Sequence, residues 1–445
     1  MSKNINRPAK NKNVVVAKKK NDPPSRLKGF RDLIGEDKRY WRLVVDKATQ
    51  LSKVYDYERL ELPQIESLSL FEKLHGKNSE AITKELYSFT DNGNEKVALR
   101  HHFKAPLARA LMEHLIGDEP VMIKTCLIGP LYRYVKTQSG FYREHRQWNM
   151  DVAGVSGPVI DAQLILIAWN FFRELQIDIT VEINNLGDEE CREAYKEALV
   201  EHYKDRAKKV KLPIELKKRL TKDPFSILTD TDERLSEFNE DAPQIVDYLS
   251  QEDKENFFLT LEHLDSLNIS YNLNPTLFGS FNFYCGTVFE FVTPEEEGRK
   301  QQVLGTGGRY SDLYSCLFDK EVPAAGFSVG LDRTVNRLKS LNLPFQSEAP
   351  PDVYFAQIGQ QARHKAMVMF EELRKSGFSV SQGFLHNGLK GQLEEAEKMQ
   401  VRFTIILGQK EMMDGTIILR DMESGAQEVV DAKKLIGELE KRMKQ

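Results

Sequence analysis

Residues 127–154 read LIGPLYRYVKTQSGFYREHRQWNMDVAG, and this stretch is the most informative part of the chain for its fold. It continues a segment, residues 121–134, whose composition predicts a strand with Arg133 near its end. The planar guanidinium of an arginine can hold a phosphate through two parallel hydrogen bonds, whereas a lysine offers only a point charge. Arg133 at the end of a strand therefore has a side chain whose geometry suits a phosphate.

The composition is that of a soluble protein with room for two or three domains. The chain has 445 residues and a net charge of -4, so no general basic field attracts nucleic acid. It has neither an apolar run near the ~20 residues of a membrane helix nor the apolar core of a secretory signal. We predict a cytoplasmic protein that does not enter membranes and keeps its thiols reduced. Its four cysteines are scattered without metal-ligand spacing, at Cys126, Cys191, Cys285 and Cys316.

The first 26 residues are predicted to be a disordered basic arm. Lysine and arginine dominate residues 1–28 against the single acid Asp22, and such a stretch buries too little apolar surface to fold. Two interpretations stay open. The arm is either a tail that contacts RNA phosphates or a solvated terminus that aids solubility.

The patterns that follow predict a mixture of helices and strands. Apolar residues recur at three- and four-residue steps over residues 36–57, which predicts an amphipathic helix. From about residue 188 to 267 the chain turns helical and highly charged, and its basic cluster either contacts phosphates or forms a solvated helix face. The cluster comprises Arg206, Lys208, Lys209, Lys211, Lys217, Lys218 and Arg219. Further strands are predicted for residues 96–100 and 179–183, and a helix for residues 162–175.

A proline-containing linker, residues 341–351, precedes a second domain at residues 352–445. Strands and helices alternate there at the spacing of a small α/β sheet. The pair Asp414-Gly415 predicts a tight hairpin turn after the strand at residues 403–407. With no redox or phosphate-binding motif in it, this domain is predicted to be a binding module. Its other strands are predicted near residues 351–359 and 378–380, and its helices at residues 361–376 and 388–399.

From about Leu27 to its C-terminus the chain resembles the histidyl-tRNA synthetase family, because several separate blocks recur in the family's order. GFRDLIGEDKRYW opens the resemblance, and LELPQIESLSLFEK, with Pro63, is similar to motif 1 of class II synthetases. Residues 127–154 resemble motif 2, a long antiparallel hairpin that holds ATP. TVFEF and GTGGRYSDL resemble the family's histidine-pocket strand and glycine turn, and AAGFSVGLDRTVNRL resembles motif 3. LKGQLEEAEKMQVRFTIILGQKEMMDGTIILRDMESG is similar to its anticodon-binding domain.

The resemblance implies an α/β fold in which helices flank a class II antiparallel sheet over residues 27–340. It also implies a helical insertion at about residues 188–267 and a small α/β anticodon-binding domain after the linker. The family pairs two chains through the helix after Glu36 and the motif 1 strand. We therefore expect a homodimer, with Trp41, Val44, Leu51, Leu62 and Pro63 forming an apolar surface between the chains.

For the nucleotide, the resemblance assigns Arg133 and Arg333 to the α- and γ-phosphates of ATP, which binds with Mg²⁺; no tightly bound cofactor is expected. Asp332 replaces the family's glutamate before the motif 3 arginine and has a shorter reach. His145 stands where an aromatic residue stacks on adenine. Val135 replaces a glutamate that accepts from the adenine amino group, and Phe141 replaces a basic residue near the outer phosphates.

The amino-acid pocket departs further from the family. His101-His102 follows Arg100 where the family has proline and the glutamate that receives the substrate ammonium, and an imidazole cannot replace that carboxylate. Phe278 or Gly279 stands where the family has its catalytic arginine, and losing such a donor costs on the order of 100- to 1000-fold in rate. The resemblance keeps a set of pocket positions at Gln147, Asp151, Tyr284, Gly307 and Gly308.

His101, His102 and His145 raise the question of a metal site. They lack the i, i+4 spacing of helical metal ligands, so we predict no metal site.

Three functions remain open. The first is a paralogue that binds RNA, and ATP as well, without activating histidine. The second is a divergent but active histidine-tRNA ligase. The third is a regulatory subunit related to histidine biosynthesis, which the C-terminal domain disfavours.

Overall fold

The computed structural model describes residues 24–117, 121–137, 141–209, 219, 224–228, 235, 239, 241–278, 283–295, 301–342 and 350–443, without the side chains of Lys208 and Lys209. The chain forms two compact units, divided after Leu343. Several predictions concern positions outside the described residues. These are most of the basic arm, most of the linker, Lys211, Lys217, Lys218 and Gly279.

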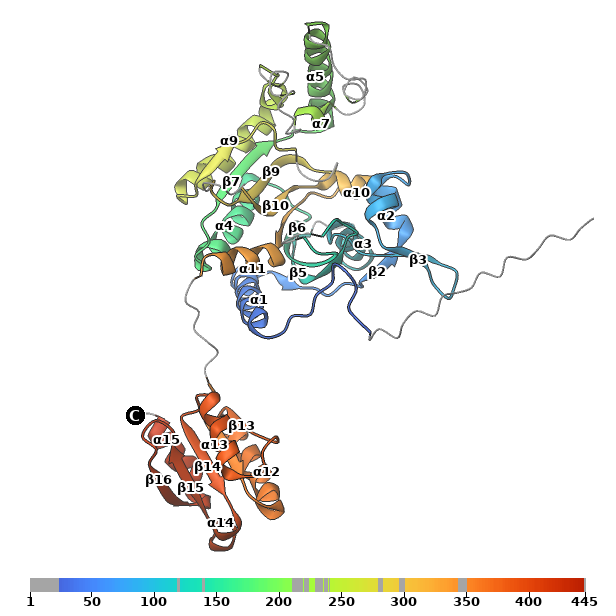
Figure 1. Ribbon diagram of the computed structural model, residues 1–445. Helices are drawn as coiled ribbons and strands as arrows, with labels where there is room; N and C mark the ends of the chain where they lie inside the picture. Colours follow the sequence, from blue (N-terminus) through green and yellow to red (C-terminus); the bar gives the residue numbers. More distant parts are fainter. Residues whose placement is uncertain are drawn as a thin grey trace, which may run out of the picture. The chain divides into compact units, whose positions relative to one another are not determined.

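The first unit is built on one large, mainly antiparallel sheet. Its strands are β1 (Glu58–Arg59), β5 (Ile123–Tyr132), β6 (Glu144–Ala153), β7 (Thr180–Asn185), β8 (Tyr271–Leu273), β9 (Cys285–Val292), β10 (Val303–Arg309) and β11 (Ala324–Gly330). Within the described part of the unit, the order is β1-β5-β6-β11-β10-β9-β7-β8. Neighbours from β5 to β7 run antiparallel, while β1 with β5 and β7 with β8 run parallel. The predicted antiparallel sheet flanked by helices is confirmed (Figure 1).

Strands β5 and β6 form the hairpin that the first sequence stretch predicted. They pair from Ile123 with Ala153 to Tyr132 with Glu144. Beyond the strands, the amide of Arg133 still donates to the carbonyl of Arg143 at 2.9 Å. Arg133 is therefore held at the end of a strand, as predicted.

Helices cover the large sheet, and their sequences explain where they begin and which face they bury. They include α1 (Glu36–Val54), α4 (Pro158–Glu174), α9 (Gln251–Ser266) and α11 (Leu331–Ser340). Two acids in the first turn of α1 favour its N-terminus, and Val44, Ala48 and Leu51 bury one face of that helix. Proline at the first position of α4 suits a helix start. α1 packs against α11 and α4, and α4 against α9 (Figure 1).

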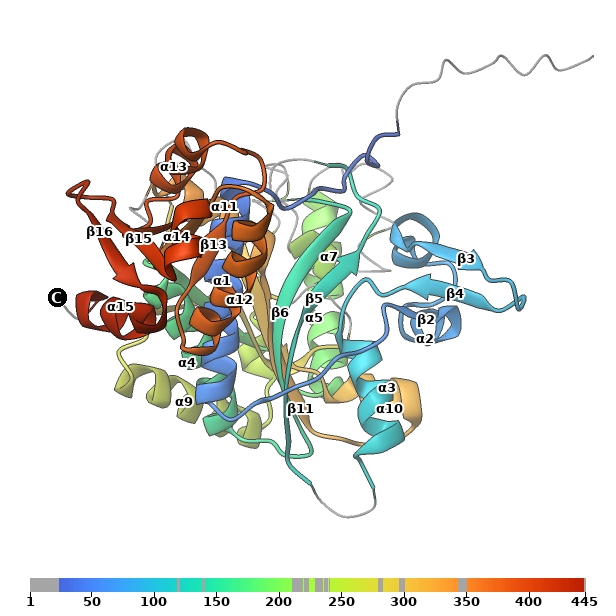
Figure 2. The same ribbon diagram turned by 90° about the horizontal axis from the view of Figure 1, so that it is seen from below.

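A small three-stranded sheet and several helices lie beside the hairpin. In the part of the chain that is described, β4 lies between β2 and β3, and α2 packs on β4 and α3 (Figure 2). The helices α5 and α7 lie beyond the ends of β7 and β9 (Figure 1). The bounds are β2 (Ile65–Ser67), β3 (Ser88–Thr90), β4 (Lys96–Leu99), α2 (Leu68–His75), α3 (Lys104–His114), α5 (Glu189–Lys209), α7 (Phe225–Leu228) and α10 (Ser311–Phe318), with single turns at Ala81–Glu85 (η1, a π-helix) and Ile245–Tyr248 (η2, a 3₁₀-helix).

The second unit is a small α/β sheet, as predicted. Its strands are β12 (Val353–Gln357), β13 (Val380–Gln382), β14 (Phe403–Leu407), β15 (Thr416–Asp421) and β16 (Gln427–Asp431). In its described residues they lie in the order β13-β12-β14-β15-β16, with the first three parallel. Its helices are α12 (Gln360–Lys375), α13 (Leu389–Lys398), α14 (Gln409–Asp414) and α15 (Leu435–Met443), with a 3₁₀ turn at Ala432–Lys434 (η3).

The prediction of a tight hairpin turn at Asp414-Gly415 is wrong, because these residues end a helix instead. Gly415 follows the helix α14 with a left-handed φ of 67°, which glycine adopts without a steric cost at the end of a helix. β14 and β15 do pair antiparallel, but a helix joins them. The residue types that favour a tight turn also favour a helix end, so the local signal does not separate the two.

Candidate active site

Arg133, His145 and Arg333 form a cationic corner, called the phosphate corner below. Arg133 follows β5, His145 lies on β6 opposite Leu131, and Arg333 lies in the first turn of α11. Burial, then the charges of Arg133 and Arg333, lower the pKa of His145 to about 4. The sequence prediction placed these three residues at ATP, and the fold brings them into one electrostatic neighbourhood.

Both arginines are held by the protein yet keep donors to spare. Arg133 pairs through its Nε with Glu85 at 2.9 Å. Arg333 donates from Nη1 to the carbonyl of Val303 at 2.8 Å, and its guanidinium lies 4.5 Å from the ring centre of Phe141. Each guanidinium has five N–H donors, so these contacts leave N–H groups that can donate hydrogen bonds to the oxygens of a bound phosphate. Burial lowers the pKa of Arg333, and the charge of Glu290 opposes that shift.

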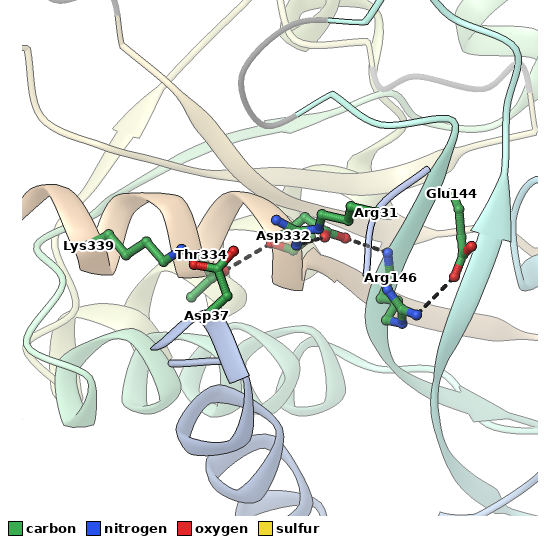
Figure 3. Close-up of polar contacts among 8 residues, drawn as sticks. Arg31, Asp37, Glu144, Arg146, Asp332, Thr334 and Lys339 are labelled. Atoms are coloured by element: carbon green, nitrogen blue, oxygen red, sulfur yellow. Dashed lines mark hydrogen bonds and ion pairs between the residues drawn. The ribbon is translucent and has the colours of Figure 1, made fainter. Parts of the chain in front are cut away.

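Asp332 is occupied elsewhere (Figure 3). Its carboxylate pairs with Arg31 and accepts from the backbone amide of Arg146 at 2.6 Å. The side chain is buried, and burial raises its pKa while Arg31 opposes the shift. Asp332 thus ties the start of α11 to β6 and to the segment before α1. This is a positioning contact for Arg333, next to it in the chain.

In the region of the predicted amino-acid pocket, a group of buried side chains contact one another or lie close together: Lys104, Asp151, Tyr284 and Tyr310. The ammonium of Lys104 pairs with Oδ1 of Asp151, and the hydroxyl of Tyr310 donates to the same oxygen at 2.8 Å. The Lys104 ammonium also lies 4.5 Å from the ring centre of Tyr310. Lys104 and Asp151 are 2% and 1% exposed. A cation from the chain itself therefore lies on the carboxylate of Asp151, one of the pocket positions that the resemblance keeps.

The polar atoms around this ion pair are partly unsatisfied. Oδ2 of Asp151 and the hydroxyl of Tyr314 are buried without a hydrogen-bond partner among the described residues. Burial raises the pKa of Asp151 and lowers that of Lys104, and the partner's charge opposes each shift. Burial and then Asp151 raise the pKa of Tyr284, which keeps its phenol neutral.

Other predicted pocket residues hold the fold. Arg100 is buried and donates to the carbonyls of Leu62 at 2.7 Å and Pro130 at 3.1 Å, so its guanidinium joins loops rather than facing a ligand. Gln147 lies on β6 between Gly129 of β5 and Gly330 of β11.

Gly307 and Gly308 lie inside β10, so the predicted glycine turn is a strand. A Cβ at Gly307 would overlap the ring of Phe289, which explains the need for glycine. Arg309 ends the strand and pairs with the buried Asp161 at 2.8 Å.

Phe278, one of the two positions predicted to replace the family's catalytic arginine, offers no cation. The ring of Phe278 lies 4.9 Å from Phe225 and stacks 6.1 Å from Tyr195, both in the helical segment after β7. Its side chain therefore packs in an apolar cluster.

Two of the three histidines considered in the sequence lie together with a fourth histidine. His101 and His102 meet His75, the last residue of α2, and His145 lies in the phosphate corner instead. Burial is the largest cause that lowers the pKa of all three, and the charge of Arg133 lowers it further. The three imidazoles, called the histidine cluster below, are therefore neutral near pH 7.

The sequence patterns did not identify Lys104 or His75 as site residues. A lysine inside the apolar run FKAPLARAL was a usable signal for Lys104, because a buried lysine needs an anionic partner. No local signal pointed to His75, which reaches the site through the packing of α2 on β4 and α3.

Two family models match the chain in succession. The histidyl-tRNA synthetase model matches residues 29–334, and the anticodon-binding-domain model matches residues 352–442. The histidine–tRNA ligase of Thermosipho melanesiensis is 32% identical over 416 residues, which are 93% of this chain and 97% of that protein. That of Limosilactobacillus fermentum is 34% identical over 404 residues, 90% of this chain and 93% of that protein.

Solved structures agree with these matches. Apo histidyl-tRNA synthetase of S. aureus has a TM-score of 0.77 and 25% identity, and the match covers 94% of this chain and all of that one. A protein of Bacillus halodurans, described as an ATP phosphoribosyltransferase regulatory subunit/histidyl-tRNA synthetase, has a TM-score of 0.60 at 20% identity. That match covers 87% of this chain and all of the other, and it is a likeness of fold.

Proposed function

This chain belongs to the histidyl-tRNA synthetase family, and we propose that it binds RNA and ATP but no longer activates histidine. The observation that carries the proposal is the buried Lys104–Asp151 pair. Histidine would have to displace an ammonium from its own carboxylate and leave that ammonium buried without a counter-ion. Leaving one member of a buried ion pair unpaired costs about 3–5 kcal/mol, which is a large part of the binding energy of a small substrate.

The ammonium of the substrate would also lack a carboxylate counter-ion. His102, at the position of the family's receiving glutamate, lies in the neutral histidine cluster and offers no negative charge. Phe278 offers no cation to the reacting phosphate. Two charge-assisted contacts at about 2–4 kcal/mol each correspond to several powers of ten in rate if their effects roughly add.

The nucleotide side supports retained binding of ATP. Arg133 and Arg333 have donors left for phosphate oxygens, and His145 lies beside them for the base. ATP binds as its Mg²⁺ complex, and Mg²⁺ uses one or two carboxylates besides the phosphates. We assign Glu290 to it, since this partly buried carboxylate lies within electrostatic reach of Arg333.

RNA binding is proposed for the second unit, which matches the anticodon-binding model. The basic residues of the first 26 positions are proposed to add phosphate contacts that do not depend on sequence. Among the described helices, none is both long and apolar enough to cross a bilayer. We propose that the protein acts in the cytoplasm.

A homodimer is also proposed, with a changed contact surface. Val44 and Leu51 lie in the chain's own core and are not available to a partner. Val54 and Ile65 are 70% and 48% exposed in the segments that the family uses for pairing, and they support the contact instead. A stable monomer in sedimentation at micromolar concentration would contradict this part of the proposal.

Histidine-dependent exchange of pyrophosphate into ATP tests the loss of activation. We expect exchange near background from the purified protein, beside a working histidine–tRNA ligase as positive control. Robust exchange would overturn the proposal and restore the alternative of a divergent, active ligase. A role as regulatory subunit rests on the likeness of fold to the B. halodurans protein, and no contact among the described residues favours it.

A further inference from the structure

The Nε2 atoms of the histidine cluster point at one another. Nε2 of His75 lies 3.2 Å from Nε2 of His101 and 3.4 Å from Nε2 of His102. One ring nitrogen from each residue lies within 4.8 Å of the other two. The backbone explains how neighbouring residues face the same way: β4 ends at Leu99 and α3 begins at Lys104, so His101 and His102 lie in the bend between them.

These separations match those between ligands of a tetrahedral metal ion. Zinc binds imidazole nitrogen at about 2.0–2.1 Å, so two ligands at the tetrahedral angle lie about 3.3 Å apart. Two of the three pairs already have this spacing. The ring nitrogens of the third pair, His101 and His102, lie within 4.8 Å of each other and have to come closer if both bind one ion.

A cluster without metal is the competing explanation. His75 Nε2 would accept a hydrogen bond from the Nε2–H of both neighbours, and the amide of Ala105 would donate to Nδ1 of His102 at 3.4 Å. That arrangement leaves Nδ1 of His101 buried as an acceptor without a partner among the described residues. A bound metal exchanges this unpaired acceptor for an unpaired N–H at Nδ1 of His101, and the long contact from Ala105 must open. The spacing of the Nε2 atoms is therefore the observation that supports the metal.

The surroundings permit a cation without attracting it strongly. Phe71 packs edge-on against the rings of His101 and His102 and gives the cluster an apolar wall. Arg133 and Lys104 oppose a positive ion, but Glu85 and Asp151 pair with them and reduce the repulsion. Neutral imidazole is the form that ligates metals, and burial favours it here. His75 is partly exposed, so an ion can enter past it.

We propose that His75, His101 and His102 bind one divalent transition-metal ion of the Zn²⁺ class through their Nε2 atoms. Three imidazoles leave the fourth tetrahedral position open, as in sites where zinc binds water or a ligand. Imidazole nitrogen suits zinc or cobalt, whereas magnesium prefers oxygen ligands. The proposal does not rest on the loss of histidine activation, because metal binding is measured directly.

The test uses the full-length protein, freed of any affinity tag and stripped with a chelator. Titration with Zn²⁺ is expected to show one site per chain, with a dissociation constant of about 1 µM or tighter. Co²⁺ is expected to give the intense visible bands of a tetrahedral site, which Zn²⁺ then removes. His75→Gln is expected to weaken Zn²⁺ binding by more than about 100-fold, since even indirect partners of a metal ligand matter 10- to 100-fold.

His114→Gln is the matched control, because this histidine is 70% exposed on α3 and lies outside the cluster. Its Zn²⁺ affinity should equal that of the unchanged protein. Substitutions of the buried His101 or His102 risk unfolding the protein, and the partly exposed His75 avoids that problem. Three results would each overturn the proposal: no site in the unchanged protein, equal affinity after His75→Gln, or an octahedral Co²⁺ spectrum.

Discussion

The phosphate corner and the amino-acid pocket are built on the same strand, β6, yet they treat charge in opposite ways. The corner keeps Arg133 and Arg333 with N–H donors left for a ligand. The pocket instead uses up its carboxylate, because the ammonium of Lys104 lies on Asp151. The two regions can therefore lose function separately. Under the proposed function, the nucleotide contacts persist while the buried Lys104–Asp151 pair closes the site for the amino acid.

Removing the pocket's own cation should have the largest effect on stability. Lys104→Met leaves Asp151 charged and buried, so the free energy of unfolding should fall by about 3–5 kcal/mol in urea titrations. Adding Asp151→Asn removes the orphaned charge and should restore part of the loss. Lys77→Met, at an exposed position, should change stability by less than about 0.5 kcal/mol. An equally small effect of Lys104→Met would mean that the pocket is not closed by this ion pair.

Acid should weaken the fold partly through the phosphate corner. The folded-state pKa of His145 is about 4, below the ordinary 6.5, so the unfolded chain binds a proton that the folded one does not. Its contribution is full above pH 6.5 and is lost as pH falls to 4, up to about 3 kcal/mol. The pKa values of the histidine cluster are also lowered, so His145→Asn should remove only part of this pH dependence. Urea unfolding at pH 7 and pH 4.5 measures the free energy of unfolding at each pH. The same difference between the two pH values in the unchanged protein and in His145→Asn would contradict the account.

Loss of one phosphate ligand should weaken ATP binding by a smaller amount. Arg133→Ala removes charge-assisted hydrogen bonds of about 1.5–3 kcal/mol, roughly 10- to 150-fold in affinity. The ATP affinity of Arg133→Lys should lie between those of the unchanged protein and Arg133→Ala, because the lysine offers a point charge in place of the planar guanidinium. Arg59→Ala, on an exposed arginine paired with Glu61, is the control and should bind ATP normally. Calorimetric titration with Mg²⁺-ATP measures these affinities; unchanged binding by Arg133→Ala would remove the corner from the nucleotide site.

The smallest expected effect concerns RNA and salt. Deleting residues 1–23 removes seven lysines and arginines, Lys3, Arg7, Lys10, Lys12, Lys18, Lys19 and Lys20. For every RNA phosphate that the shortened protein no longer neutralises, the slope of log affinity against log salt should fall by about 0.7–0.9. Filter binding of transfer RNA over a range of salt concentrations measures the slope. An unchanged slope would favour the interpretation of the arm as a solubilising terminus.

The sequence predicted much of the fold because its local patterns are strong. The periodic apolar face of α1, the strand before Arg133 and the alternation in the second unit all appear in the structure. The local signal at Asp414-Gly415 was wrong, and so was the glycine turn that the resemblance implied at Gly307-Gly308, since glycine serves close packing and helix ends as well as turns.

The sequence identified the two arginines of the phosphate corner and Asp151 of the predicted amino-acid pocket, but not the lysine that pairs with Asp151. Arg133 and Arg333 stand at positions that the resemblance identifies, and a guanidinium group is suited to binding phosphate. Lys104 and His75 could not be assigned in that way. Their roles come from which elements pack together, namely α3 on the sheet that carries Asp151 and α2 on the bend after β4. Contacts between elements that are distant in the sequence produce no periodic pattern that a single sequence could reveal.

Calorimetric titration of one sample with Mg²⁺-ATP and then with histidine tests the central claim most directly. An open phosphate corner and a filled amino-acid pocket predict heat of binding from ATP and none from histidine at millimolar concentration, with or without bound ATP. Saturable binding of one histidine per chain would contradict the claim, because it would require Lys104 to leave Asp151 at little cost.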